Sequence, residues 1–453
     1  TNKEVVSCHE LDKIFMDPFF VKGAQLFLSL SLLIVLHEFG HFIPARLFKI
    51  RVEKFFLFFD VKFSLFKKKI GETVYGIGWL PLGGYVKIAG MIDESMDKEA
   101  MAQEPKEWEF RSKPAWQRLI VMIGGVTVNI ILGFFIYIMI IAYYGNPVVG
   151  PEQMPDGIEV SEGFKEYGFR DGDQILAVNG APYENNLAIN RDMMLRDVSS
   201  ITVAHTDGSE ETITIPEDIG TTMFQSGETD ALAPLIKPVL DSVVPESAAA
   251  KAGLKKGDVL TQINDNPINT WTDFKGSKKE GVNEYAVTYS RDGQLANTTV
   301  TLDDNGNFGV YPKANYKSKV VKYSFGESIA KGINHGYWKL HDYVAQFKYV
   351  FTKKGASQVG GFGAIAGLFP DTWNWLSFWE TTAFISIILA FMNILPIPAL
   401  DGGHVMFLLY EIITGRKPSD KFLEYAQMIG FFLLIALVLY ANGNDIYRWI
   451  TGS

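Results

Sequence analysis

The stretch that decides the fold is Leu33-Ile34-Val35-Leu36-His37-Glu38-Phe39-Gly40-His41-Phe42-Ile43-Pro44, an apolar run that holds two histidines and a glutamate. On a helix, His37 and His41 are four residues apart and share a face, so both imidazoles can converge on one metal ion. Glu38 lies beside them, where a carboxylate can take a proton from a metal-bound water. The HExxH spacing therefore predicts zinc-activated hydrolysis.

The apolar surroundings distinguish this motif from a chance HExxH in a soluble helix. Between Gly23 and Ala45 the only ionisable side chains are those of the motif itself. Ionisable groups at membrane depth are costly and are retained where a function or a partner holds them. That cost disfavours the alternative of a satisfied pair of core histidines. We expect the metal site to lie inside the bilayer.

The composition limits what else the chain can do. Its 453 residues exceed one ordinary domain, and a hydrophobic fraction of 47% beside a net charge of -9 indicates a mixture of membrane and soluble parts. A single cysteine, Cys8, excludes an intrachain disulfide and a CxxC metal site, so a metal must be held by His and carboxylate groups. The soluble regions carry no basic patch, and we predict no nucleic-acid partner.

Four apolar segments predict a multi-pass α-helical membrane protein. By the positive-inside rule, the basic residues around Arg46, Arg118 and Lys417 lie toward the cytoplasm, and both termini lie outside. After an N-terminal extension over 1–20, the predicted transmembrane helices cover 21–48, 116–145, 378–413 and 424–447. A membrane-associated β-hairpin region with an interfacial segment covers 49–115, and two soluble domains cover 146–232 and 233–315. An amphipathic, interfacial region over 316–377 contacts lipid.

The second span contains small and polar residues, Gly124, Gly125 and Asn129. Such residues let transmembrane helices approach closely and hydrogen-bond in lipid. We expect the second span to contact the helix that carries HExxH.

The hairpin region alternates apolar and polar residues at Val61, Phe63 and Leu65, which is the period of a strand. A sheet placed directly after an intramembrane site can offer an edge strand to an extended peptide. Val61, Phe63 and Tyr85 are therefore candidate substrate contacts. An ordinary cytoplasmic loop with strand-like packing is an alternative that the sequence leaves open.

An internal repeat divides the soluble region. The segment Gly168–Pro182 recurs as Gly253–Pro267 at an offset of 85 residues, which is a domain-sized period. The second copy, with Gly253-Leu254 before Gly257-Asp258, resembles the PDZ domains of bacterial envelope proteases. This resemblance implies two tandem PDZ domains that bind peptides at a sheet edge. The alternative is that both domains bind nothing and act as a size filter over the membrane site.

The third span ends in a sequence that predicts a break in the helix. Pro396 and Pro398 free backbone groups, which lipid tolerates only beside protein or a cavity. A catalytic zinc takes three protein ligands, so His37 and His41 need a third, and Asp401 at this break is our candidate. His404 lies beyond two glycines and ranks below it. A helix-terminating Asp-Gly-Gly turn is the structural alternative.

Several motifs in one order carry a resemblance to a known family. HEFGH at 37–41, Pro81-Leu82-Gly83-Gly84-Tyr85-Val86-Lys87, the tandem repeat and Asn393-x-x-Pro396-x-Pro398-x-x-Asp401-Gly402-Gly403 resemble the site-two protease family of intramembrane zinc metalloproteases, in its bacterial branch of the regulator-of-sigma-E type. The chain departs from the family where prolines are common, at Gly125-Val126-Thr127-Val128-Asn129 and at Gly361-Phe362-Gly363.

The resemblance implies Zn²⁺ held by His37, His41 and Asp401, Glu38 as general base, and Asn393, Pro396 and Pro398 near the substrate. It implies transmembrane substrates, of the anti-sigma factor type or remnant signal peptides, that a prior periplasmic cut has trimmed. It places the protein in the bacterial inner membrane with its PDZ domains in the periplasm. The competing hypothesis is a non-catalytic PDZ scaffold with a structural zinc, which has no use for the base Glu38.

Overall fold

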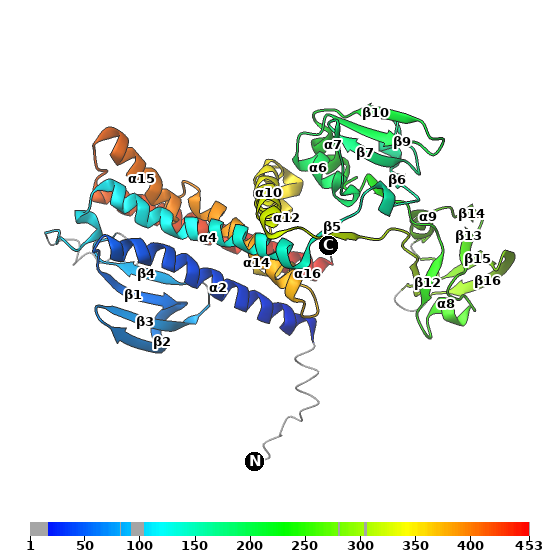
Figure 1. The fold of residues 1–453 in the computed structure, drawn as a ribbon. Helices are drawn as coiled ribbons and strands as arrows, with labels where there is room; N and C mark the ends of the chain where they lie inside the picture. The colour runs from blue at the N-terminus through cyan, green and yellow to red at the C-terminus, as the bar shows by residue number, and fades with distance from the viewer. Residues whose placement is uncertain (1–16, 82, 92–103, 280, 303–305, 453) are drawn as a thin grey trace, which may run out of the picture. The chain divides into compact units, whose positions relative to one another are not determined.

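The computed structural model describes residues 17–81, 83–91, 104–279, 281–302 and 306–452 (Figure 1). Most of the predicted N-terminal extension and part of the predicted interfacial segment, residues 92–103, lie outside the described residues. The chain divides into two compact units, Thr1–Gly145 with Lys322–Ser453, and Asn146–Val321.

Within the described residues of the first unit, four helices are long and apolar enough to cross a membrane, in agreement with the predicted number. Helix α2 begins after Asp17, whose carboxylate accepts a hydrogen bond of 2.8 Å from the Phe19 N–H, and Pro18 occupies the first helical position. The four helices are α2 (Pro18–Leu47), α4 (Ala115–Tyr144), α14 (Trp375–Ile394) and α16 (Asp420–Thr451).

Helices α2 and α4 lie side by side (Figure 1), and glycines of the two helices are in contact. A Cβ atom on Gly40 would overlap the backbone of Gly124, and a Cβ atom on Gly124 would overlap the carbonyl of Gly40. Only glycine permits this approach, as in other membrane helix pairs with small residues at the interface. The predicted contact between the second span and the HExxH helix is confirmed.

The third predicted span, 378–413, consists of two helices separated at the predicted break. Helix α14 ends at Ile394, and a separate helix, α15 (Asp401–Thr414), begins after an irregular turn. Pro396 and Pro398 lack the N–H groups that a continuous helix needs. Ala399 then adopts a φ of +80°, and its N–H donates to the Gln427 side chain of α16 at 3.1 Å. Asp401 then becomes the first residue of α15.

The region predicted as amphipathic, 316–377, contains short helices and one long one. The long helix, α10, packs against α4 and begins with a capping box in which Ser324 and Glu327 satisfy each other's backbone N–H groups. These helices are α10 (Phe325–Ala345), α11 (Phe347–Val350), α12 (Lys353–Gln358) and α13 (Phe362–Gly367).

The region after α2 forms a four-stranded mixed sheet and is not a simple series of hairpins. Its strand order is β2-β3-β1-β4, in which β2 and β3 form a hairpin with Gly71 in the turn at φ +61°. Because β3 inserts beside β1 in parallel, β2 and β4 become the two edges. The strands are β1 (Val52–Leu57), β2 (Phe59–Ile70), β3 (Thr73–Leu80) and β4 (Tyr85–Ile88).

The second unit contains two lobes whose repeated residues adopt the same local structure. Strands β7 and β13 stand at the 85-residue offset, and the asparagine after each strand, Asn179 or Asn264, has a φ near +50°. The buried aspartates before these strands, Asp173 and Asp258, each accept a backbone hydrogen bond from three residues earlier, at 2.8 and 2.7 Å. The sequence repeat is therefore a structural repeat.

Each lobe has one four-stranded sheet, with orders β10-β9-β7-β8 and β14-β13-β15-β16. The predicted division at 232/233 falls inside β11, which pairs with β6 of the first lobe, and β18 extends the unit beyond 315 by pairing with β5. The first lobe contains β5 (Asn146–Val148), β6 (Ile158–Val160), α5 (Glu162–Lys165), β7 (Gln174–Val178), β8 (Ala181–Pro182), α6 (Ile189–Leu195), β9 (Ser200–Ala204), β10 (Glu210–Thr214), α7 (Ile219–Ser226) and β11 (Leu232–Pro234). The second contains β12 (Leu240–Val243), α8 (Ala248–Lys251), β13 (Val259–Ile263), β14 (Asn266–Pro267), α9 (Trp271–Gly276), β15 (Glu284–Arg291), β16 (Gln294–Thr301) and β17 (Val310–Pro312), followed by β18 (Lys319–Val321).

Candidate metal centre

Two imidazoles and one carboxylate converge at the side of α2. The Nε2 atoms of His37 and His41 lie 3.3 Å apart, and each lies 3.3 Å from Oδ2 of Asp401. Ligand atoms at about 2.0–2.1 Å from a tetrahedral zinc ion are about 3.3 Å from one another. The triangle formed by these three atoms therefore has the size of one face of a zinc coordination sphere.

The carboxylate oxygen of Asp401 supports this fit. Oδ2 is buried and has no hydrogen-bond partner among the described residues, although it faces two ring nitrogens. A buried anionic oxygen without a compensating donor or cation is costly. A metal ion bound between Asp401, His37 and His41 would supply the missing positive charge, and the donor set of two imidazoles and one carboxylate suits zinc.

The ring orientation of His41 is fixed by its second nitrogen. Nδ1 lies 2.8 Å from the carbonyl oxygen of Val121 on α4. A carbonyl only accepts hydrogen bonds, so Nδ1 carries the proton and Nε2 is left with its lone pair facing Asp401. This is the tautomer that a metal ligand through Nε2 requires.

Gly125 forms part of the wall of the site and was not predicted as a site residue. A Cβ atom at this position would lie against Nε2 of His41 and Cε1 of His37. Helix α4 can therefore approach both imidazoles only because residue 125 lacks a side chain. The glycine pair at 124–125 was visible in the sequence as a packing signal, without any indication that one member faces the histidines.

A cavity of about 470 Å³ opens beside the three groups. Its walls come from α2, from the sheet and from the turn before α15. Glu38 lines this cavity together with both histidines, and all four residues of strand β4 also line it. The residues from these elements include His37, Glu38, His41, Val61, Gly84, Tyr85, Val86, Lys87, Ile88, Ala399, Leu400, Asp401 and His404.

The other predicted site residues fall into two groups. Asn393 reaches the centre, because its Nδ2 lies 3.5 Å from Nε2 of His37, and Val61 and Tyr85 line the cavity. Phe63, Pro396 and Pro398 are not among the described residues that line it. The role of each of these residues as a substrate contact stays a prediction.

The structure accounts for the positions of the three residues away from the cavity. Lys62 has a φ of +67° and the β2–β3 register shifts beside it, so Phe63 leaves the face of Val61 and stacks on Trp79 at 5.6 Å between ring centroids. The two prolines instead shape the turn that brings Asp401 to the histidines.

A polar cluster of Asp60, Tyr85 and Lys54 lies at the cavity rim. The Asp60 carboxylate accepts a hydrogen bond of 2.7 Å from the Tyr85 hydroxyl and pairs with Lys54 at 3.2 Å. Partial burial alone would raise the pKa of Asp60, but the Tyr85 and Lys54 hydrogen bonds and the Lys54 charge hold it below the ordinary value. The cluster ties β4 to β1 and β2 beside the substrate cavity.

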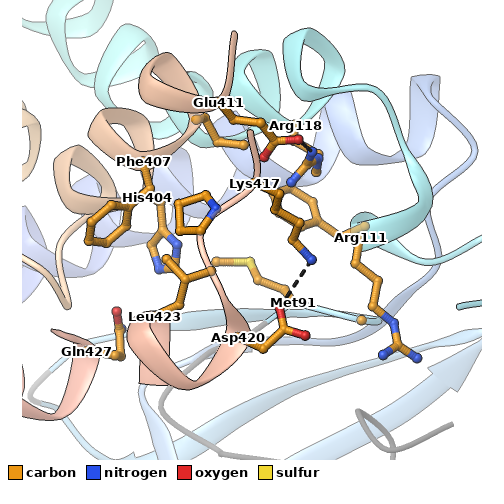
Figure 2. A pocket seen from close by; sticks show the side chains of 14 residues that line it. Met91, Arg111, Arg118, His404, Phe407, Glu411, Lys417, Asp420, Leu423 and Gln427 are labelled. Atoms are coloured by element: carbon orange, nitrogen blue, oxygen red, sulfur yellow. Dashed lines mark hydrogen bonds and ion pairs between the residues drawn. The ribbon is translucent and has the colours of Figure 1, made fainter. Parts of the chain in front are cut away.

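A second pocket, formed by α4, α15 and α16 with the segment around Met91, adjoins the cavity (Figure 2). It shares Met91, His404 and Gln427 with the cavity wall. A buried ion pair of 2.5 Å joins Arg118 of α4 to Glu411 of α15. This pair holds α15, and therefore Asp401 at its first turn, against α4. His404 lines both spaces, but it is not part of the group His37, His41 and Asp401, whose ligand atoms lie within 4.8 Å of one another.

Paired HExxH histidines, a distant aspartate and an adjacent glutamate on an open cavity define the class of zinc hydrolases. The sequence profile of peptidase family M50 matches residues 25–437, and the chain belongs to this family. It is a zinc-dependent metalloprotease of the site-two protease type and a bacterial inner-membrane protein.

Three relatives illustrate the similarity. The regulator of sigma-E protease RseP of Escherichia coli K12 is 29% identical over 94% of this chain and 98% of its own length. A putative zinc metalloprotease of Neisseria meningitidis is 28% identical over 93% and 97% of the two chains. A putative zinc metalloprotease of Campylobacter jejuni is 26% identical over 93% and 92%. The similarity thus extends over nearly the full length of this chain and of each relative.

We expect Gly125→Ala to lower zinc affinity by about 10-fold or more, because the new methyl group occupies the space between the two imidazoles. The measurement is zinc bound per purified protein across a chelator titration. The control is Gly443→Ala in α16, where an added Cβ meets nothing within 4 Å. Zinc binding at the wild-type level in Gly125→Ala would contradict the proposed packing of α4 against the histidines.

Proposed function

We propose that this chain cleaves the transmembrane segments of single-span membrane proteins, with Zn²⁺ held by His37, His41 and Asp401. The observation that carries the proposal is the convergence of these three groups within 4.8 Å, with both histidines on α2, a helix long and apolar enough to cross a bilayer. Zinc in such a site supplies an activated water as the nucleophile. The scissile bond must then reach the centre from within the membrane.

Glu38 is the general base of the proposed mechanism. It directly follows His37 in the sequence and lines the cavity with both histidines, and it is not one of the three converging ligand groups. Its carboxylate takes the proton of the attacking water and delivers it to the nitrogen of the leaving amine. An open cavity beside the base also argues against a structural zinc in a non-catalytic scaffold, because structural zinc sites are closed.

The substrate must unwind before it can be cut. Carbonyl groups of a helical segment are occupied by hydrogen bonds to the residue four positions later, and pairing with an edge strand would expose them. Strand β4 is the favoured edge, because Tyr85 through Ile88 line the cavity. Asn393 contacts the substrate backbone in this proposal, which is supported by the 3.5 Å distance between its Nδ2 and Nε2 of His37.

We further propose that the substrates are proteins of the anti-sigma factor type, and remnant signal peptides, that a periplasmic cut has trimmed first. The similarity to regulator of sigma-E proteases supports this substrate class. The two repeat lobes act as PDZ domains that gate access, either by binding peptides or by excluding untrimmed substrates. Basic residues at Arg46, Arg118 and Lys417 orient the chain with both termini and both lobes in the periplasm.

We expect Glu38→Gln to bind zinc like the wild type and to cleave a single-span substrate about 10²- to 10⁴-fold more slowly, because it lacks the base but keeps the ligands. Asp401→Ala should lose both zinc and cleavage. Zinc content and cleavage rate are measured on the same purified, detergent-solubilised proteins. Cleavage by Glu38→Gln at the wild-type rate would refute the base, and full zinc in Asp401→Ala would refute the third ligand.

Substrate pairing with β4 predicts a cross-link at position 87. In a Glu38→Gln, Cys8→Ser background, Lys87→Cys should form a disulfide with a cysteine placed beside the scissile bond of a bound substrate, because Lys87 lines the cavity. Lys69→Cys, on the opposite edge strand β2, is the matched control and should not. Equal cross-linking at both positions, or cross-linking only from position 69, would assign the substrate to another surface.

A further inference from the structure

We propose that Asn129 is a positioning residue of the metal site, which accepts a hydrogen bond from the Nδ1–H of His37 and so turns Nε2 of that ring toward the metal. This inference rests on the proposed function, in which His37 is a ligand. Asn129 lies on α4, is fully buried at 0% exposure, and its Nδ2 is 3.2 Å from Nδ1 of His37.

The position of the proton on the His37 ring determines the orientation of the Asn129 carboxamide. A histidine that binds metal through Nε2 carries its proton on Nδ1, so the partner of Nδ1 must be an acceptor. With Nδ2 toward the ring, two donors would face each other, while Oδ1 is buried and has no hydrogen-bond partner among the described residues. A half turn of the amide places Oδ1 of Asn129 on the Nδ1–H and resolves the conflict between the two donors.

The same helix serves both imidazoles. The Val121 carbonyl accepts from Nδ1 of His41, and Asn129 lies eight residues later, with Gly125 halfway between them. A spacing of four residues puts all three on one stripe of α4. This stripe provides an acceptor for each histidine and, at Gly125, the space in which the rings fit. Only the acceptor at residue 129 comes from a side chain, so it alone depends directly on residue identity.

The position of Asn129 is itself fixed from a third helix. Its backbone carbonyl accepts a buried hydrogen bond of 2.7 Å from the hydroxyl of Ser386 on α14. Helix α14 leads into the turn that delivers Asp401. Asn129 therefore connects the HExxH helix, through its side chain, to the helix before the third ligand, through its backbone carbonyl.

The test compares Asn129→Leu, which removes the acceptor at similar size, with Asn129→Asp, which keeps an acceptor oxygen. The proteins are full-length and detergent-solubilised. We expect the zinc dissociation constant to rise about 10- to 100-fold in Asn129→Leu, and to remain within about 3-fold of wild type in Asn129→Asp. Thr127→Val, an exposed polar-to-apolar change on the same helix, is the control and should leave affinity unchanged.

A second readout reports ligand geometry and is independent of activity. In cobalt-substituted protein, the visible absorption bands should shift in Asn129→Leu and be restored in Asn129→Asp. Wild-type affinity and spectrum in Asn129→Leu would overturn the proposal, and so would equal losses in both variants, which would indicate packing alone. His37→Ala is measured alongside: wild-type zinc affinity there would refute the ligand set itself, and the positioning role with it.

Discussion

The structure depends on one constraint, that the charge of Asp401 must be compensated inside a bundle of apolar helices. An isolated carboxylate is costly in such a place, and two imidazoles with a bound metal ion would provide the compensation. The contacts around the centre bring Asp401 and the two histidines together. His37 and His41 present their Nε2 atoms from one face of α2, and the turn after α14 carries Asp401 to 3.3 Å from both.

Three features of the helix packing maintain that geometry. Gly40 and Gly124 let α2 and α4 approach to backbone contact, and Gly125 leaves room for the rings. The proline turn at 396–398 separates the end of α14 from the start of α15. The buried Arg118–Glu411 pair then holds α15 against α4. The removal of either partner would leave the other charge without its counter-charge, which is costly in a largely buried place. The pair therefore stabilises the packing of α15 against α4.

Features that depend on short-range periodicity could be predicted from the sequence. The HExxH face needs only the helical period, the four spans need only length and apolarity, and the 85-residue repeat reappears in β7 and β13. Asp401 could be chosen because a zinc site with two histidines needs a third ligand and few ionisable groups lie at membrane depth. The prolines indicated a break, although the separate helix α15 was not expected.

Features that depend on long-range pairing could not be predicted. The parallel insertion of β3 beside β1 and the Asp60–Tyr85–Lys54 cluster require strand register, which local alternation does not define. Asn129 was visible as a polar residue in a span, but its contact with His37 joins positions 92 residues apart. The most direct test of the central claim is X-ray absorption spectroscopy of the zinc-loaded, full-length protein. The account predicts a first shell with scattering from two imidazoles and with carboxylate oxygen at about 2.0–2.2 Å. A third imidazole, or sulfur at about 2.3 Å, would contradict it.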